Sequence, residues 1–335
     1  MSQKSKIQWT ENTWPIVTGC RMRSPGCLNC YAIKDSWRLS HNPNPKISEP
    51  YKDTVVKDES GKLKWSNVVK CHPERLGWVL QWKKPSMVFV SNMADLFDAD
   101  VPDEFIDQVW AHMAIASHHQ FQVLTKEPER MKLYLRGGAK QRIRRATVDL
   151  GRELNLPHEV YLDFETCQFD WPLNNVWVGT SVENQAMANK RIRYLLETPA
   201  AVRFLSCEPL LGELDLSEWL AEPLGEGICD VCEETGQLYA LDSGPVAGAA
   251  ICTKCCPRLD WVITGGESQG RPCHQDWLRS VVQQCQRAKV KVFVKQLGSY
   301  SIEGITDVKV KLKDRKGGDI NEFPNDLQIR QFPEF

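Results

Sequence analysis

Three cysteines near the N-terminus lie close enough in sequence to act together as metal ligands. They follow the pattern Cys20-x6-Cys27-x2-Cys30, in a segment that also holds glycine and proline. Three thiolates on one compact loop can ligate three irons of a [4Fe–4S] cluster and leave the fourth iron open to another ligand. The same spacing suits a zinc knuckle with its fourth ligand elsewhere, or three unrelated buried thiols. The spacing alone leaves these alternatives open.

A second cysteine group lies in the last third of the chain. It reads Cys229-x2-Cys232-x19-Cys252-x2-Cys255, with Cys256 directly after the last of them. Two C-x2-C pairs about 20 residues apart are typical of a zinc ribbon, because Zn²⁺ takes four thiolates in a tetrahedron. The alternatives are a second iron–sulfur cluster or a chance group of buried thiols, and Cys256 can replace Cys255 as a ligand. We expect zinc in a closed site with a structural or partner-binding role.

Length and composition narrow the class of protein. The chain has 335 residues, of which 42% are hydrophobic and 25% charged, which is enough for one large domain or two ordinary ones. No apolar run approaches the roughly 20 residues that cross a bilayer, and the N-terminus has no apolar signal segment. We therefore expect a soluble, cytoplasmic protein with no membrane partner. Thirteen cysteines without a secretion signal then indicate metal or redox chemistry rather than disulfides.

The elements that must position these cysteines alternate along the chain. Short β-rich runs cover residues 87–90, 121–124, 176–178, 202–205, 261–263 and 290–294, with helical patterns over 102–116, 188–196 and 277–288. A further strand at 7–9 would lead toward the cysteine loop. Such alternation predicts right-handed βαβ units around a parallel sheet. We expect an α/β fold, a full or partial (β/α) TIM-type barrel of six to seven parallel strands, whose site forms at the carboxyl ends of the strands.

Several segments interrupt this alternation. The predicted organisation is a barrel over 1–221 and 259–300, an inserted four-cysteine metal module over 222–258, and a C-terminal extension over 301–335. The Pro-rich, charged residues 42–70 are interpreted as a surface excursion. Residues 136–145, RGGAKQRIRR, carry five cations although the whole chain has a formal net charge of −1. This segment is either a phosphate-contacting patch or a solvated loop without a partner.

The cysteine loop resembles that of radical SAM enzymes. The segment TGCRMRSPGCLNCYA, residues 18–32, follows a predicted strand and precedes a helix, with an aromatic after the last cysteine. The usual loop is C-x3-C-x2-C, so the first interval of six is a departure. It is most similar to the phage-associated three-cysteine-motif branch, whose loop reads G-C-x-x-x-S-P-G-C-x-x-C-Y-A. The resemblance continues through NMADLF (92–97), VLTKEPERM (123–131), VGTSVEN (178–184), RFLSCEPLLG (203–212), GGES (265–268) and VKQ (294–296).

The resemblance implies an enzyme with two cofactors, a [4Fe–4S] cluster and S-adenosylmethionine. A reductant such as flavodoxin or ferredoxin would reduce the cluster, and cleavage of S-adenosylmethionine would give a 5′-deoxyadenosyl radical that abstracts hydrogen from a substrate. By analogy with DNA-lesion lyases and base-modifying members, a nucleic acid or nucleotide is the expected substrate, in DNA modification or repair. A rival hypothesis is a non-catalytic metal-binding protein that uses the barrel and the zinc ribbon to bind partners.

The resemblance also assigns residues to S-adenosylmethionine near the first strands. Ser91, Asn92 and Asp95 follow the strand after the cluster loop, where the family binds the amino group. Tyr31 would pack near the adenine or the cluster, although a core role is equally open. For Asp95 the alternative is capping of a helix N-terminus, a common position for acids.

Further candidates follow the third and fourth predicted strands. Ser181 and Glu183 lie where family members contact the ribose or the carboxylate, and Glu183 can instead cap a helix. Arg191 and Arg203 could bind the carboxylate of S-adenosylmethionine through a bidentate fork. A solvated helix face would explain Arg191 as well.

Charged residues end four different strands and would converge on the barrel mouth. Lys126, Glu208 and Lys295 are candidate catalytic residues, and Glu267 is a candidate cofactor contact. Mutual ion pairs are the alternative. Cys207 beside Glu208 could donate a hydrogen atom to a radical, although a small buried core residue is the more ordinary interpretation.

Overall fold

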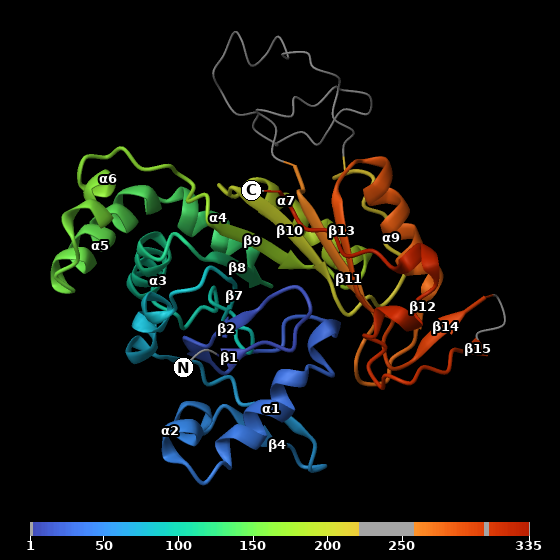
Figure 1. Cartoon of the computed structure of the whole chain (residues 1–335). Coiled ribbons are helices and arrows are strands. Elements are labelled where there is room, and N and C mark those ends of the chain that lie inside the picture. The colour runs from blue at the N-terminus through green and yellow to red at the C-terminus, as the bar shows by residue number, and fades with distance from the viewer. Residues whose placement is uncertain (1–2, 221–257, 305–307, 335) are drawn as a thin grey trace. The chain divides into compact units, whose positions relative to one another are not determined.

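The computed structural model describes residues 3–220, 258–304 and 308–334, and these form two compact units. The first unit contains residues 1–180 and 198–201, and the second contains residues 181–197 and 202–335 (Figure 1). The second cysteine group, Cys229, Cys232, Cys252 and Cys255, lies outside the described residues. The predictions of zinc and of a separate four-cysteine module therefore stay predictions.

The first unit is built on a mainly parallel sheet. Its strands are β1 Gln3–Lys4, β2 Asn12–Trp14, β7 Met87–Val90, β8 Gln120–Thr125 and β9 Val176–Ser181, of which Ser181 already belongs to the second unit. β1 pairs antiparallel with β2, whereas β2, β7, β8 and β9 run parallel in that order. β2, β7, β8 and β9 are almost wholly buried, as expected for a parallel sheet that is covered on both faces.

Helices and small elements of the first unit surround that sheet. The helices are α1 Tyr31–Ser40, α2 Pro45–Ser48, α3 Asp103–Ile115, α4 Pro128–Arg136, α5 Ala139–Glu153 and α6 Leu162–Glu165. Short strands are β3 Val17–Thr18, β4 Val55–Lys57, β5 Leu63–Trp65 and β6 Lys70–Cys71. The 3-10 turns are Pro25–Cys27, Glu49–Tyr51, Pro73–Gln81 and His158–Val160. α3 buries Phe105, Ile106, Val109, Trp110 and Met113, the apolar positions of its helical pattern.

The second unit repeats the strand–helix alternation. Its parallel strands are β10 Val202–Cys207, β11 Trp261–Gly265 and β13 Lys291–Gln296, with helices α7 Gln185–Leu196 and α9 Gln275–Arg287. A small sheet joins β12 Cys273–His274, β14 Ser301–Glu303 and β15 Val308–Lys309, and 3-10 turns cover Ile320–Glu322 and Asn325–Leu327. The C-terminal residues pair with the edge of β13, since Gln331 N donates to Val292 O at 3.0 Å.

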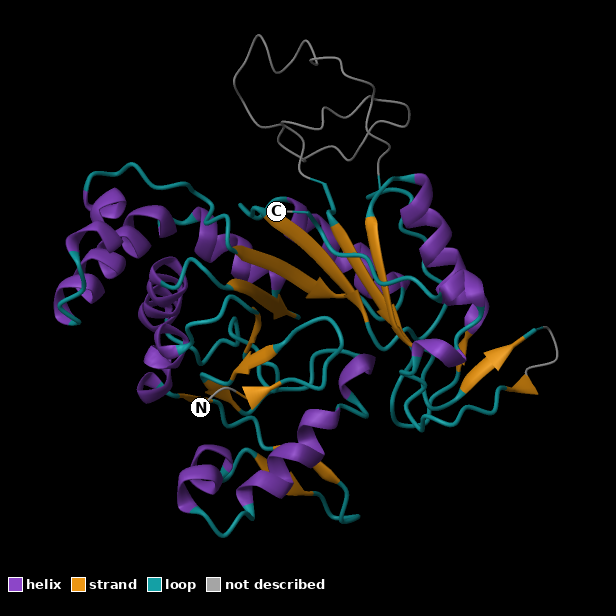
Figure 2. Cartoon of the chain, in the orientation of Figure 1, coloured by secondary structure: helices purple, strands orange, loops and turns teal. Residues whose placement is uncertain are grey.

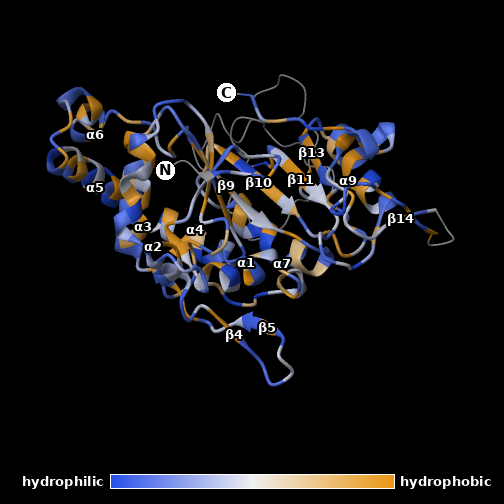
Figure 3. Ribbon diagram, turned by 60° about the horizontal axis from the view of Figure 1, so that its bottom comes forward, coloured by the Kyte–Doolittle hydropathy of each residue, from blue (hydrophilic) through white to orange (hydrophobic). Residues whose placement is uncertain are grey.

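The fold class is confirmed. Seven parallel strands follow one another in chain order, with helices between them, which is the α/β arrangement of a partial TIM-type barrel (Figure 2). In Figure 3 the hydrophobic colouring is concentrated along β9 to β11. All six strands predicted after residue 85 are present, within three residues of the predicted ends. No helix in the described part of the chain is long and apolar enough to cross a membrane.

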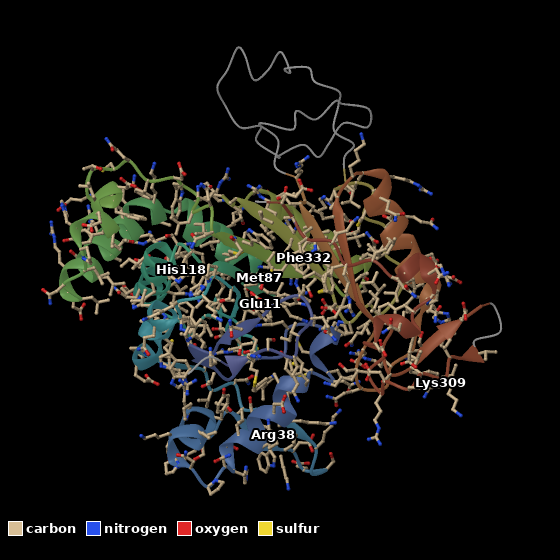
Figure 4. All side chains as sticks on the ribbon, in the orientation of Figure 1. Glu11, Arg38, Met87, His118, Lys309 and Phe332 are labelled. Carbon is tan, nitrogen blue, oxygen red and sulfur yellow. The ribbon has the colours of Figure 1, made fainter. Side chains whose placement is uncertain are left out.

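The predicted first strand at 7–9 is wrong, because those residues form the turn of a hairpin. Ser5 N donates to Glu11 O at 2.8 Å, and the strand that enters the sheet is β2. Trp9 is buried because its ring packs on the ring of Phe89, with the two ring centroids 4.7 Å apart. A buried aromatic residue in a turn thus resembles a residue of a buried strand in the sequence. The backbone of Glu11 then pairs with Met87 of β7 (labelled in Figure 4).

The basic residues 136–145 are not a loop. α5 begins at Ala139, directly after Gly138 in the left-handed region at φ +79°. Its apolar residues pack on α3, where Ala111 contacts Ala146 and Leu150, and Ala139 and Ile143 near its start are buried as well. The loop interpretation of this segment is therefore wrong.

Candidate active site

The cysteine loop follows β3 in the first unit, and a glycine fixes its entry. Gly19 has φ +80°, and a Cβ there would lie 2.0 Å from the carbonyl oxygen of Val68. Only glycine fits this close approach in a left-handed conformation. The turn places Cys20 at the start of the loop, with Cys27 and Cys30 following around a 3-10 turn.

Backbone N–H groups point at two of the three sulfurs. Arg23 N donates to Cys27 Sγ at 3.5 Å. Burial raises the pKa of Cys30, whereas the backbone N–H groups of Ala32 and Ile33 lower it. Cys30 is the N-cap residue of α1, where backbone donors and the helix dipole favour a thiolate.

The three thiols lie within electrostatic reach of one another and of a carboxylate. Burial raises the pKa of Cys20 well above its usual value, and Asp95, Cys30 and Cys27 raise it further. Four acidic groups thus share one partly desolvated region, where a cationic centre would stabilise all of them. Among the described residues, no three His, Cys, Asp or Glu side chains gather tightly enough to hold a single metal ion.

An apolar cluster covers the cysteines, and the sequence prediction missed it. Ala32 and Ile33 of α1 pack with Val55 and Trp65 of the β4–β5 hairpin, and Cys20, Cys30, Trp37, Leu63 and Met93 pack against this cluster. The hairpin belongs to the predicted surface excursion 42–70. The sequence of the hairpin alternates apolar and polar residues, but strands of only three residues give a pattern too short to predict a strand from.

Two arginines inside the loop anchor it to a buried aspartate that the prediction also missed. Asp98 is 1% exposed and pairs with Arg23 Nη2 at 3.0 Å and with Arg21 Nε at 3.3 Å. Arg23 Nε also pairs with Glu127 at 2.8 Å, and Arg21 pairs with Asp100. A buried carboxylate with two arginines holds the loop from its base.

Asp95 is not a helix cap. Its carboxylate accepts from Thr125 Oγ1 at 2.6 Å, Lys126 N at 2.8 Å and Phe97 N at 3.0 Å. Burial raises the pKa of Asp95, and these hydrogen bonds lower it. Lys126 Nζ donates to Ser24 Oγ at 3.1 Å, so its ammonium lies over the cysteine loop.

The residues after β7 also lie beside the loop. Tyr31 Oη donates to the carbonyl oxygen of Asn92 at 2.8 Å. Ser91 is 2% exposed, adopts φ +53°, and its hydroxyl has no hydrogen-bond partner in the described part of the chain. A strained, buried and unsatisfied hydroxyl is typical of a binding site rather than of a core.

In the second unit the predicted ligands of S-adenosylmethionine pair with each other. Arg191 Nη1 donates to Glu183 Oε2 and to Ser181 O, both at 2.9 Å, and both charged side chains are buried. Asn184, not Glu183, caps α7 by accepting from Met187 N at 3.0 Å. The solvated interpretation of Arg191 is therefore wrong, because the helix turns this residue toward the sheet.

Arg203 lies at the opposite end of its strand from the predicted mouth. It is the second residue of β10, and its N–H donates to Asp260 Oδ2 at 2.8 Å. Burial lowers the pKa of the guanidinium. Because the site forms at the carboxyl ends of the strands, the proposed carboxylate fork of Arg203 is wrong.

The end of β10 carries a thiol and a carboxylate. Cys207 is fully buried, and burial raises its pKa well above the usual value, with Cys285, Glu208 and Glu183 adding to the rise. Lys295 Nζ lies 3.3 Å from Glu208 Oε1. A Cβ on Gly265 would come within 2.9 Å of that same oxygen, so a glycine leaves room for the ion pair.

Glu267 lies at the end of β11 and already holds an arginine. Arg271 Nε donates to Glu267 Oε2 at 2.9 Å, and Arg271 N donates to the same oxygen at 3.1 Å. Gln296 Nε2 donates to Gly266 O at 2.6 Å and ties β13 to this turn. The alternative that the four charged strand-end residues pair with one another is therefore confirmed in part. Glu208 pairs with Lys295, whereas Lys126 and Glu267 have other partners.

The sequence matches a family model over residues 4–324, which is nearly the whole chain. The family is described as a protein of unknown function, DUF5131. The chain belongs to this family. No curated protein matches the sequence.

Two solved structures are similar to this DUF5131 protein. One is spore photoproduct lyase complexed with dinucleoside spore photoproduct, at 9% identity and a TM-score of 0.37, with 87% of this chain and 65% of that chain covered. The other is a mutant of spore photoproduct lyase, at 10% identity and a TM-score of 0.32, with 65% and 57% covered. The chain spans less than two thirds of the length of either structure.

Proposed function

We propose that this protein is a radical SAM enzyme that holds a [4Fe–4S] cluster on Cys20, Cys27 and Cys30. The observation that carries the proposal is the loop itself. Burial and the neighbouring thiols raise the pKa values of Cys20 and Cys30, backbone N–H groups point at the sulfurs of Cys27 and Cys30, and an apolar cluster packs against Cys20 and Cys30. A multi-iron cluster binds each thiolate to a different iron, which suits thiols that are mutually close yet too spread for a single ion.

The residues present fit that group. Deprotonated sulfurs need compensating donors and positive charge, and the N-terminus of α1 and the ammonium of Lys126 supply both beside Cys30. When bound and reduced, the cluster supplies the electron that splits S-adenosylmethionine into methionine and a 5′-deoxyadenosyl radical. The protein's contribution is to fix the loop through Asp98 and to exclude water with the apolar cluster.

Residues beside the loop are proposed to hold S-adenosylmethionine. Ser91 offers a buried hydroxyl, and Asn92 and Asp95 offer acceptors for its amino group next to the cysteines. Tyr31 is 37% exposed and forms one side of this region. In the second unit, Glu183 would contact the ribose or carboxylate end, and we assign Arg191 to orienting Glu183 rather than to binding the ligand directly.

The remaining assignments concern substrate and partners. We propose a nucleic acid or nucleotide as substrate, with Glu208, Lys295 and Glu267 contacting it or the cofactor and Cys207 as hydrogen-atom donor. Flavodoxin or ferredoxin is the proposed reductant, and Zn²⁺ on Cys229, Cys232, Cys252 and Cys255 the proposed second metal. Within the radical SAM superfamily, the phage-associated three-cysteine-motif branch is the proposed place of the chain.

The test is anaerobic reconstitution followed by incubation with S-adenosylmethionine and dithionite. We expect brown protein with iron and sulfide, and release of 5′-deoxyadenosine. Replacing Cys20, Cys27 or Cys30 singly by Ala should remove most of the iron, whereas Cys71→Ala, a partly exposed thiol of the same unit, should retain it. Full iron in all three loop variants would overturn the assignment. Colourless protein that carries zinc at the loop would favour the non-catalytic metal-binding alternative.

A further inference from the structure

The C-terminal residues hold a dense group of cations in the second unit. Within the eight residues 309–316, KVKLKDRK, five side chains are basic and one is acidic. We call this segment the basic strap. All five cations are exposed, whereas Val310 and Leu312 are half-buried, so the chain turns its lysines outward and its apolar side chains inward. The basic members are Lys309, Lys311, Lys313, Arg315 and Lys316. Figure 4 labels Lys309 beside the small sheet of this unit.

Nearby carboxylates bind the backbone of the strap and not its cationic side chains. Glu322 accepts from Lys313 N at 2.7 Å and from Asp314 N at 2.9 Å. Asp314 accepts from Lys316 N at 3.1 Å and from Gly318 N at 2.7 Å. None of the five basic side chains forms an ion pair within the described ranges 3–220, 258–304 and 308–334. The strap is therefore rigid in its backbone while its positive charge stays available to a ligand.

The strap lies at the carboxyl ends of β11 and β13. Leu297 N, just after β13, donates to Gly317 O at 2.7 Å. Gly317 has φ +64°, and a Cβ there would come within 2.7 Å of Gly298 O, so only glycine allows this contact. Gly298 in turn packs on Gly266, which follows β11, since a Cβ on Gly298 would lie 3.0 Å from the Cα of Gly266. These are the strand ends that carry Lys295 and Glu267.

We propose that the basic strap binds the phosphate backbone of a nucleic acid and holds it at the carboxyl ends of β11 and β13. The inference rests on the proposed function, which it extends by naming the surface that receives the substrate. Lys309 ends β15, and Val310 N donates to Ser301 O at 2.9 Å, so Lys309 and Lys311 on either side of Val310 project on the same side about 6–7 Å apart. The bend and turn over 313–316 bring three further cations close to these two. Cations in such a group gain affinity by releasing counterions from the polyanion.

A nucleic acid fits this surface better than an acidic protein partner does. Phosphates repeat at regular intervals along a nucleic acid, which matches a run of closely spaced cations, and binding of an acidic electron carrier is an outcome that the test distinguishes. In the other concentrated basic segment, 136–145, one cation is neutralised, because Arg142 Nε pairs with Asp107 Oδ2 at 3.1 Å. That segment supplies a matched control with the same number of replaceable cations.

The experiment measures binding of a labelled single-stranded DNA oligonucleotide, and of its duplex, to the reconstituted full chain over a series of salt concentrations. The strap variant combines Lys311→Gln, Lys313→Gln, Arg315→Gln and Lys316→Gln. The control combines Arg136→Gln, Lys140→Gln, Arg144→Gln and Arg145→Gln. We expect the strap variant to bind at least about tenfold more weakly and to lose up to about 3 from the slope of log K against log salt, while the control stays close to wild type.

Each other outcome overturns the proposal. Unchanged affinity in the strap variant would show that the strap does not touch nucleic acid. Equal losses of DNA affinity in the strap variant and the control would mean that DNA is attracted to positive charge anywhere on the protein and that the strap is not a dedicated binding surface. Unchanged DNA binding with slower reduction by an acidic electron carrier would assign the strap to a protein partner. Release of 5′-deoxyadenosine in the absence of DNA tests the proposed function separately. The proposal for the strap can therefore be wrong while the proposed function is right.

Discussion

The acidic groups beside the cysteines of the first unit and the carboxylates at the strand ends of the second unit have different partners. In the first unit, burial raises the pKa values of Cys20, Cys30 and Asp95, and neighbouring acidic groups raise them further. In the second unit, each carboxylate at the strand ends holds its own cation: Glu183 pairs with Arg191, Glu208 with Lys295 and Glu267 with Arg271. Negative groups that crowd together favour an external cation, whereas neutralised pairs can only orient each other or a polar ligand. Under the proposed function, the first unit would hold the metal and the second would position the ligand.

The largest effect on folding should come from the buried pair of the second unit. Arg191→Met leaves the Glu183 carboxylate buried without its cation, and we expect a loss of about 3–5 kcal/mol in the free energy of unfolding. Arg193→Met, which changes an exposed residue of the same helix, should cost much less. Urea unfolding of both variants measures this. Equal, small losses would show that Glu183 does not depend on Arg191.

The next effect tests the base of the cysteine loop. Asp98→Asn removes the charge that holds Arg21 and Arg23, and we expect a cost of about 1.5–3 kcal/mol, typical of hydrogen bonds to charged groups. The loop should also release iron to a chelator faster than wild type. The matched control is Asp100→Asn, since Asp100 is exposed and pairs only with Arg21 among the described residues. Identical iron release in the two variants would argue against a clamp at Asp98.

Binding of S-adenosylmethionine should respond to residues beside the loop. Ser91→Ala and Asn92→Ala should each weaken binding by about 1–3 kcal/mol, the cost of a lost buried hydrogen bond, with iron content unchanged. Val178→Ala, in the core of β9, should lower stability and leave the affinity near that of wild type. Titration of the reconstituted proteins measures both. Wild-type affinity for S-adenosylmethionine in both Ser91→Ala and Asn92→Ala would show that these residues do not bind the cofactor.

The smallest effect belongs to the pair at the end of β10. The side chains of Lys295 and Glu208 are 20% and 10% exposed, so solvent screens their attraction only in part, and Lys295→Met should cost about 1–2 kcal/mol in the free energy of unfolding, between the values for surface and for buried pairs. If Lys295 instead acts on a substrate, turnover should fall far more than stability does. Parallel measurement of unfolding and of product formation separates the two roles, and a matched fall in both would reduce Lys295 to a structural residue.

Much of the strand pattern was available from local sequence. Runs such as Met87–Val90 and Trp261–Gly265 are short and apolar between polar ends, because a parallel strand is buried on both faces. The three-cysteine loop was equally local, since its ligands lie within eleven residues. The prediction of a strand at 7–9 was wrong for the opposite reason. Trp9 is buried by packing on Phe89, a contact between residues distant in sequence, and local sequence does not distinguish such a residue from one in a buried strand.

The sequence by itself determined which residues are candidates for chemistry, because residue type and short spacing are properties of the chain. Only the tertiary structure decided which charges they meet. Asp98 beneath the loop and Gly317 against Leu297 depend on contacts between distant segments, and the pairing of Arg191 with Glu183 depends on which side of α7 packs on the sheet. Desolvation and pairing depend on distance in space, so the same arginine is a solvated surface group or a buried counter-ion according to how the helix beneath it packs.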